Sequence, residues 1–175
     1  MEETNSLIIL GIDPGIAIVG YGIIEYKDNK FKVIDYGAIT TPAHTNILSR
    51  LETIYKGINI LIKNYNVDEI GIEELFFNKN VKTAITVAQA RGVIMLACGH
   101  NDKPVYEYTP LQVKQGVVGY GRADKAQVQQ MVKSFLNLKS VPKPDDVADA
   151  LAVAICHCHS NKLEKTFKNI GGQYV

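Results

Sequence analysis

The 175-residue sequence contains no tryptophan, only three cysteines and no long apolar run. A membrane-spanning helix needs about 20 consecutive apolar residues, and no stretch here approaches that length, so no membrane segment is predicted. The first six residues, Met1 to Ser6, are acidic and polar, unlike the start of a secretory signal. We therefore expect a cytoplasmic protein that does not interact with membranes.

The cysteines are Cys98, Cys156 and Cys158. Their number is odd, and Cys156 and Cys158 are too close in the chain for an easy disulfide, so we expect reduced thiols. The run Cys156-His157-Cys158-His159 has the residue types of a zinc site. Neighbouring residues of one helix point about 100° apart, however, and cannot surround an ion as a tetrahedron. We expect no metal at this run.

Charge is distributed unevenly, although the net charge is only +1. Residues 1–78 contain 6 basic and 11 acidic side chains, residues 79–143 contain 10 and 3, and residues 144–175 contain 3 and 4. A basic middle third beside acidic flanks fits a phosphate-binding surface next to a carboxylate cluster. The alternative is that these lysines only cover the solvent-exposed faces of helices and bind nothing.

Apolar spacing predicts a single α/β domain over residues 1–160, followed by a flexible tail at residues 161–175. Strands are expected at residues 7–13, 18–26, 31–40, 68–73 and 104–108, and helices at residues 47–65, 81–99, 110–118, 124–136 and 145–159. The order is that of RNase H-like nucleases, in which helices cover both faces of a five-stranded mixed sheet. Helix 81–99 is apolar on more than one face, which predicts a central position or a subunit interface.

Acidic residues end two of the predicted strands. Asp13 precedes Pro14-Gly15, and Glu73 follows Ile70-Gly71-Ile72. Ligands commonly bind at the carboxyl edge of α/β sheets, which favours a functional site there. The alternatives are a turn-forming aspartate and a solvated loop acid. Because successive strand residues point to opposite faces, only one of Glu73 and Glu74 can join a shared site, and parity does not choose between them.

Three further acids, Asp145, Asp146 and Asp149, open the last predicted helix. Capping and the helix dipole are sufficient reasons for Asp145 and could also explain Asp146. Asp149 lies among small apolar residues on the same face as Asp146, which favours an inward-facing carboxylate. Converging carboxylates need a cation, and oxygen ligands favour Mg²⁺ or Mn²⁺. Two such ions about 3.5–4 Å apart can hydrolyse a phosphodiester.

Several motifs together resemble those of RuvC-type Holliday junction resolvases, from Ile9 to about Ser160. The segments that carry the resemblance are Ile9-Leu10-Gly11-Ile12-Asp13-Pro14-Gly15, Gly20-Tyr21-Gly22, Ile72-Glu73, Gln89-Ala90-Arg91-Gly92, Val113-Lys114-Gln115, Val117-Val118-Gly119 and Asp149-Ala150-Leu151-Ala152. The family's catalytic and metal-binding acids fall on Asp13, Glu73, Asp146 and Asp149. The neighbours Asp145 and Glu74 depart from the pattern, and the spacing from Asp149 favours Asp146.

The resemblance also implies how DNA is bound. Lys114 and Lys125 match basic residues near the scissile phosphate, and Phe76 matches an aromatic residue that stacks on bases opened at the junction, which contributes about 1–3 kcal/mol per base. Solvated lysines and plain aromatic packing are the alternatives.

A wider set of properties follows from the same family. It implies four-way junction DNA as the substrate, two Mg²⁺ ions per site with Mn²⁺ as a substitute, and a homodimer for which helix 81–99 is the candidate interface. It also implies the branch-migration proteins RuvA and RuvB as partners. Paired symmetric incisions, each leaving a 5′-phosphate and a 3′-hydroxyl, would serve homologous recombination and DNA repair.

Three other functions share features with this sequence. Gly11 to Gly15 resembles the first phosphate loop of actin-like phosphotransferases, but Ile16 and Ala17 follow where Ser or Thr is usual, and Gly171-Gly172 lies in the tail rather than in a second phosphate loop. A junction-binding module would lack cleavage. A nuclease of linear duplex or RNA–DNA hybrid would share the chemistry and differ in substrate.

Overall fold

The computed structural model describes residues 6–75 and 81–171, and the side chains of residues 6–75 and 84–160. The elements follow one another in the order β1 (Leu7–Asp13), β2 (Ile18–Lys27), β3 (Lys30–Thr40), α1 (Ile47–Asn64), β4 (Glu69–Glu73), α2 (Val81–His100), β5 (Val105–Tyr108), α3 (Pro110–Val118), α4 (Lys125–Phe135) and α5 (Asp145–Gly171). The predicted order of strands and helices is confirmed.

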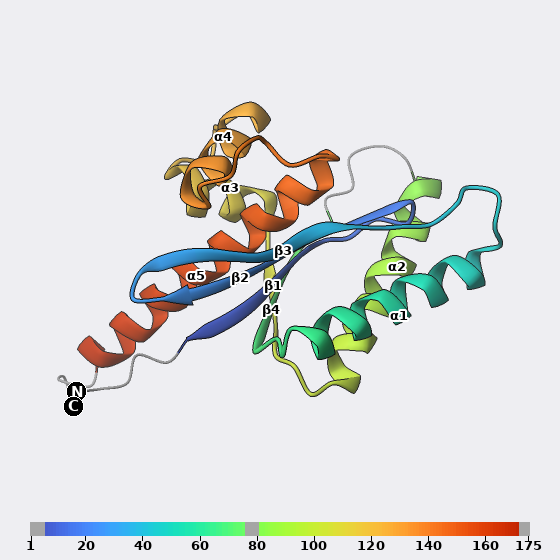
Figure 1. The fold of residues 1–175 in the computed structure, drawn as a ribbon, viewed down its shortest axis with the longest axis horizontal. Helices are drawn as coiled ribbons and strands as arrows, with labels where there is room; N and C mark the ends of the chain where they lie inside the picture. Colours follow the sequence, from blue (N-terminus) through green and yellow to red (C-terminus); the bar gives the residue numbers. More distant parts are fainter. Residues whose placement is uncertain (1–5, 76–80, 172–175) are drawn as a thin grey trace.

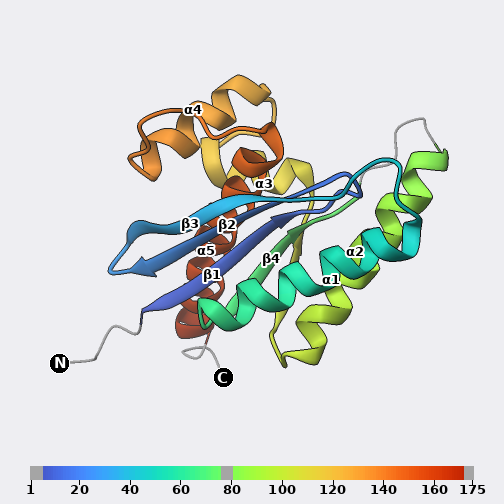
Figure 2. The same cartoon turned by 45° about the vertical axis from the view of Figure 1, so that its right-hand side comes forward.

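All five strands form one mixed sheet in the order β3-β2-β1-β4-β5. The pairs β1–β2 and β2–β3 are antiparallel, whereas β1–β4 and β4–β5 are parallel. Helices α1 and α2 cover one face, and α3, α4 and α5 cover the other (Figure 1). Figure 2 shows the same three layers from a second direction. The predicted RNase H-like architecture, a five-stranded mixed sheet with helices on both faces, is therefore present.

Alternation along the strands divides the core into two layers. Leu10 and Ile12 of β1 pack toward α1 and α2, whereas Ile9 packs toward α5. By the same alternation, Gly11 and Asp13 face α5. The carboxylate that ends β1 therefore lies on the face that α5 covers.

Glycines bring α5 unusually close to the sheet. A Cβ atom at Gly11 would overlap the carbonyl oxygen of Ala150, and one at Gly20 would overlap the carbonyl oxygen of Asp146. At Gly22 it would lie 2.5 Å from the Leu151 side chain. Gly11 pairs with Gly22 across β1 and β2, and Gly20 pairs with Asp13. The absence of side chains at Gly11, Gly20 and Gly22 allows the first turns of α5 to lie beside Asp13.

Two helices differ from the sequence-based expectation or refine it. Helix α5 continues to Gly171, twelve residues past its predicted end at His159, while the flexibility of residues 161–175 stays a prediction. Helix α2 buries Ala90, Ile94 and Ala97 and leaves Ile85 and Leu96 more than half exposed. No helix in the described ranges combines the length and hydropathy that crossing a bilayer requires.

The three cysteines and the two histidines of the run 156–159 lie within the described residues. Cys98, Cys156 and Cys158 are buried and free. His157 lies 2.7 Å from Glu69, and His159 Nδ1 lies 2.7 Å from the carbonyl oxygen of Gly116. The two histidines of the run are thus engaged with protein groups on different elements.

Candidate active site

Two strand ends supply the first pair of carboxylates. β1 and β4 are neighbours and parallel, with Ile12 opposite Ile72, so the next residues, Asp13 and Glu73, leave the sheet side by side. Their side chains share a hydrogen bond. On β4, Gly71 contacts Val153 and His157 of α5, which places Glu73 on the α5 face as well. Because Gly71 and Glu73 point to the same face of β4, Glu73 and not Glu74 joins Asp13 beside α5. Glu74 is exposed.

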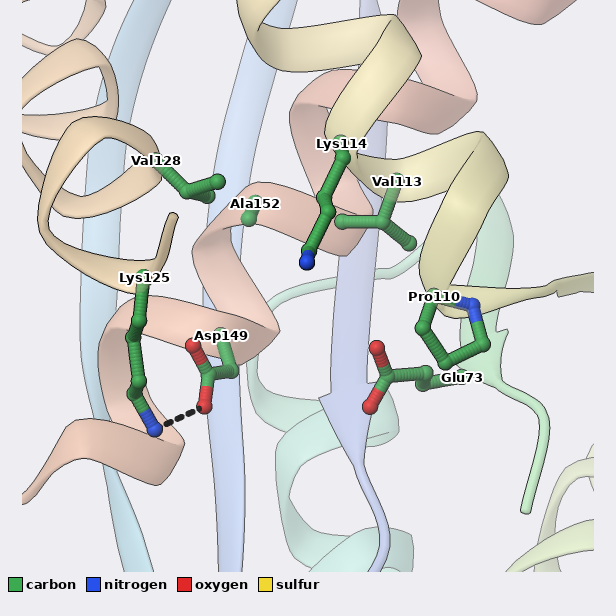
Figure 3. A pocket seen from close by; sticks show the side chains of 8 residues that line it. All are labelled: Glu73, Pro110, Val113, Lys114, Lys125, Val128, Asp149 and Ala152. Atoms are coloured by element: carbon green, nitrogen blue, oxygen red, sulfur yellow. Dashed lines mark hydrogen bonds and ion pairs between the residues drawn. The ribbon is translucent and has the colours of Figure 1, made fainter. Parts of the chain in front are cut away.

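Helix α5 supplies the second pair. Asp149 and Glu73 line a cavity of about 250 Å³ and lie across from one another in Figure 3. Asp146 lies close enough to Asp13 for its negative charge to raise the pKa of Asp13. The cavity is lined by Glu73, Pro110, Val113, Lys114, Lys125, Val128, Asp149 and Ala152. The structure thus brings all four predicted acids to one place.

Burial and mutual repulsion make this cluster hold protons strongly. Burial, followed by the charges of Glu73, Asp149 and Asp146, raises the pKa of Asp13 from 3.8 to about 8. Burial and the charge of Asp149 raise the pKa of Glu73 to about 7. Burial also raises the pKa of Asp149, against the opposing effect of Lys125. Such a site has an excess of negative charge and favours cations.

Lysines from two helices border the acids. Lys125 Nζ lies 2.9 Å from Asp149 Oδ2 and 3.4 Å from Asp145 Oδ2. Partial burial lowers the pKa of Lys125, but the hydrogen bond and the charge of Asp149 outweigh burial, and the pKa is raised. Lys114 points into the cavity from α3 (Figure 3), and its charge lowers the pKa of Glu73.

Capping boxes fix the starts of the helices that carry these lysines. The Thr109 side chain accepts from the Gln112 backbone N–H, and Pro110 is the first residue of α3. Asp124 accepts in the same way from Gln127 at the start of α4. Each lysine is therefore close to a well-defined helix terminus rather than on an irregular loop.

Asp145 faces differently from Asp146. Its carboxylate lies 2.6 Å from Lys143 Nζ, and the hydrogen bond from Lys143 lowers its pKa. Asp145 contributes to the raised pKa of Asp149, whereas Asp146 contributes to those of both Asp13 and Asp149. The structure therefore favours Asp146 as the partner of Asp13. The predicted base-stacking residue Phe76 lies outside the described residues.

The donor set fits a hard divalent cation. Within the described part of the chain, no three His, Cys, Asp or Glu side chains are already gathered as the ligands of one ion. Asp149 bonds instead to Lys125. Mg²⁺ is commonly bound through one or two carboxylates, with waters and substrate phosphates completing its octahedron, so a finished protein cage is not required. The carboxylates of Asp13, Glu73, Asp146 and Asp149 meet that requirement.

Known proteins resemble the chain over nearly its whole length. The sequence profile of the family described as crossover junction endodeoxyribonuclease RuvC matches residues 9–157. A crossover junction endodeoxyribonuclease RuvC of Clostridioides difficile (strain 630) is 85% identical over 169 residues, which are 97% of this chain and 100% of that protein.

Solved structures agree with the sequence comparison. A Thermus thermophilus RuvC structure has a TM-score of 0.83 at 32% identity and covers 90% of this chain and 97% of its own. Thermus thermophilus RuvC in complex with Holliday junction substrate has a TM-score of 0.87 at 31% identity, with 90% of this chain and 96% of that chain covered. The chain therefore belongs to the family of RuvC crossover junction endodeoxyribonucleases.

Proposed function

We propose that this protein is a metal-dependent endonuclease that resolves four-way DNA junctions. The observation that carries the proposal is the meeting of Asp13, Glu73, Asp146 and Asp149 at one edge of the sheet, bordered by Lys114 and Lys125. The relative from Thermus thermophilus was solved with a Holliday junction substrate, which supports the same substrate here. Family membership argues against an actin-like phosphotransferase.

The four acids would hold Mg²⁺ in this site, and Mn²⁺ accepts the same oxygen ligands. Two bound ions would activate a water molecule and stabilise the leaving oxygen of the phosphodiester. Lys125 would exchange part of its contact with Asp149 for the scissile phosphate, while Lys114 approaches the same phosphate from α3. The two ammonium groups thereby neutralise backbone charge at the point of cleavage. Attack on phosphorus with departure of the 3′ oxygen leaves a 5′-phosphate and a 3′-hydroxyl.

A homodimer would place two such sites on one junction. A four-way junction has two-fold symmetry, and a C2 dimer presents two equivalent sites related by the same symmetry. Leu48 on α1 and Ile85 and Leu96 on α2 are exposed by 52% or more. Leu48 and Leu96 also line an apolar groove of about 340 Å³ between α1 and α2. These exposed apolar side chains support the α2 face as the dimer interface.

The dimer is tested by light scattering of the wild type and of Leu96→Glu at micromolar concentration. The expected result is a dimer for the wild type and a monomer for the variant, because an unpaired charge in an apolar interface is costly. A monomeric wild type contradicts the proposal. The branch-migration proteins RuvA and RuvB and a cytoplasmic location stay predictions from the sequence.

The substrate is tested by incubating the protein and Mg²⁺ with a labelled four-way junction and, in parallel, with linear duplex of the same sequence. We expect paired nicks at symmetric positions in two strands of like polarity, in the junction alone. Equal cutting of the duplex rejects the junction as the specific substrate. Binding without cleavage in both Mg²⁺ and Mn²⁺ leaves only a junction-binding module.

A further inference from the structure

We propose that a buried hydrogen-bond chain, Glu69–His157–Tyr108, positions the active-site carboxylates by fixing β4, β5 and α5 relative to one another. The inference rests on the function proposed above. His157 lies on α5 and is fully buried. Its Nε2 lies 2.7 Å from Glu69 Oε2, and its Nδ1 lies 2.7 Å from the hydroxyl oxygen of Tyr108. A single imidazole therefore joins a helix to two different strands.

Donors and acceptors match along the whole chain of groups. The carboxylate of Glu69 accepts, so His157 donates from Nε2. In a neutral imidazole the other nitrogen then accepts, and the phenol of Tyr108 is the donor it requires. The arrangement thus fixes the tautomer and the ring orientation of His157 together.

The three residues belong to the elements that carry the site. Glu69 begins β4, and Glu73 ends the same strand. Tyr108 ends β5 opposite Glu73, and its carbonyl oxygen accepts from the backbone N–H of Glu74. The next residue, Thr109, caps the helix that carries Lys114. The chain of hydrogen bonds consequently links β4, which carries Glu73, and β5, which leads into the helix of Lys114, to α5, which carries Asp149.

Neighbouring residues pack closely against the side chains of this hydrogen-bond chain. A Cβ atom at Gly71 would lie 3.1 Å from Val153 Cγ1, 3.4 Å from His157 Cβ and 3.6 Å from Tyr108 Cε2, so the middle of β4 packs directly against His157 and Tyr108. The ring of Tyr106 lies 4.6 Å from that of His157, centroid to centroid. The imidazole is held between aromatic rings, and its hydrogen bonds select one position along α5. A satisfied buried polar network of this kind gives a unique geometry more than it gives stability.

Glu69, His157 and Tyr108 are positioning residues because they act on the carboxylates through β4, β5 and α5. Groups behind a metal site that orient its ligands typically affect metal affinity or activity by about 10–100-fold when replaced. A displacement of only about 1 Å in the catalytic groups can have an effect of similar size. We therefore expect the loss of a hydrogen bond from Glu69–His157–Tyr108 to lower the cleavage rate and the Mg²⁺ affinity of the carboxylates.

The test uses Tyr108→Phe, which removes one hydroxyl and keeps the ring. We expect its single-turnover rate of junction cleavage at saturating DNA to fall about 10–100-fold, and its Mg²⁺ affinity without DNA, measured by calorimetry, to fall about 10-fold or more. Junction binding in EDTA is expected to stay within about two-fold of wild type, because a phosphate-dominated affinity does not depend on this hydroxyl. The matched control is Tyr65→Phe, which removes a hydroxyl that donates to Asp35 at 2.6 Å, and should leave both readouts unchanged.

Two substitutions at Glu69 separate geometry from folding. Glu69→Gln keeps an acceptor for His157 Nε2 and should retain most of the cleavage rate and Mg²⁺ affinity, whereas Glu69→Met fills a similar volume without an acceptor and should behave like Tyr108→Phe. If the hydrogen-bond chain is purely structural, Tyr108→Phe and Glu69→Met will lower the free energy of unfolding but leave the cleavage rate and Mg²⁺ affinity of the folded protein at the wild-type level. That result would overturn the inference. A wild type that does not cut junctions refutes the proposed function, and the Mg²⁺ affinities of the variants still decide the inference.

Discussion

Replacing Asp13 with asparagine should stabilise the protein when divalent cations are absent, and more so as pH rises. The pKa of Asp13 is about 8 in the folded protein against 3.8 for an ordinary aspartate. The folded state therefore binds more protons than the unfolded state between about pH 4 and pH 8, and the stability of the wild type falls as pH rises through this window. The asparagine side chain of the variant carries no titrating proton and escapes this loss.

The size of the effect follows from the pKa difference. One pH unit within the window corresponds to about 1.4 kcal/mol, so an isolated site would lose up to ~4 kcal/mol between pH 5 and pH 8. Asp13 is partly exposed and its titration is coupled to that of Glu73, which spreads the proton uptake over the cluster and reduces the contribution of one residue. We expect Asp13→Asn to gain about 1–3 kcal/mol relative to wild type over this range.

The assay is urea denaturation in EDTA at pH 5, 6.5 and 8 for the wild type, Asp13→Asn and Asp28→Asn. Asp28 is an exposed acid in the β2–β3 turn with a φ of 52°, a conformation that asparagine also tolerates, so its replacement is expected to be neutral. A gain for Asp13→Asn that does not grow with pH, or a loss at pH 8, contradicts the electrostatic description of the cluster.

Other perturbations reach the site through different contacts. Gly20→Ala should lower the free energy of unfolding by about 1–3 kcal/mol and impair cleavage, because its methyl group meets the backbone of Asp146. The control Gly99→Ala places its methyl group in open space and should be neutral or stabilising by up to about 1 kcal/mol in the same denaturation experiment. Lys125→Gln should slow single-turnover cleavage by about 10²–10³-fold and reduce the salt dependence of junction binding by about one phosphate contact, while Lys63→Gln on α1 should change neither. Adding Mg²⁺ at 100 times its Kd should stabilise the wild type by about 2.7 kcal/mol in thermal or chemical unfolding, and EDTA should remove this gain; an equal gain in Asp13→Asn contradicts ion binding at the cluster.

Much of the fold could be predicted because the apolar periodicity is regular. The three-residue and four-residue steps from Ile47 onward predicted α1, and the strand ends at Asp13 and Glu73 were predicted to the residue. The length of α5 was not predicted, although Leu163, Phe167 and Ile170 recur at steps of four and three residues beyond His159, which is the spacing of a helix.

The sequence alone could not choose between neighbouring acids, since that choice depends on which face α5 covers. The signal was present in the glycines: Gly11 and Gly71 each precede a strand-end acid by two residues and therefore share its face. A strand face without side chains indicates close packing by a helix. The ion pair of Lys125 with Asp149 and the chain through His157 join residues 24 and 88 positions apart, and no local pattern predicts such contacts.

The most direct test of the active site is single-turnover cleavage of a four-way junction in Mg²⁺ by Asp149→Asn, compared with Asp145→Asn. We expect Asp149→Asn to bind the junction in EDTA as well as the wild type does and to lose at least about 10²-fold in cleavage rate, because a metal-holding carboxylate acts in the transition state. Asp145→Asn is expected to cut within several-fold of the wild-type rate, because its carboxylate pairs with Lys143 and Lys125 and is not among the charges that raise the pKa of Asp13. Full cleavage by Asp149→Asn, or a greater loss for Asp145→Asn, contradicts the assignment of the four acids.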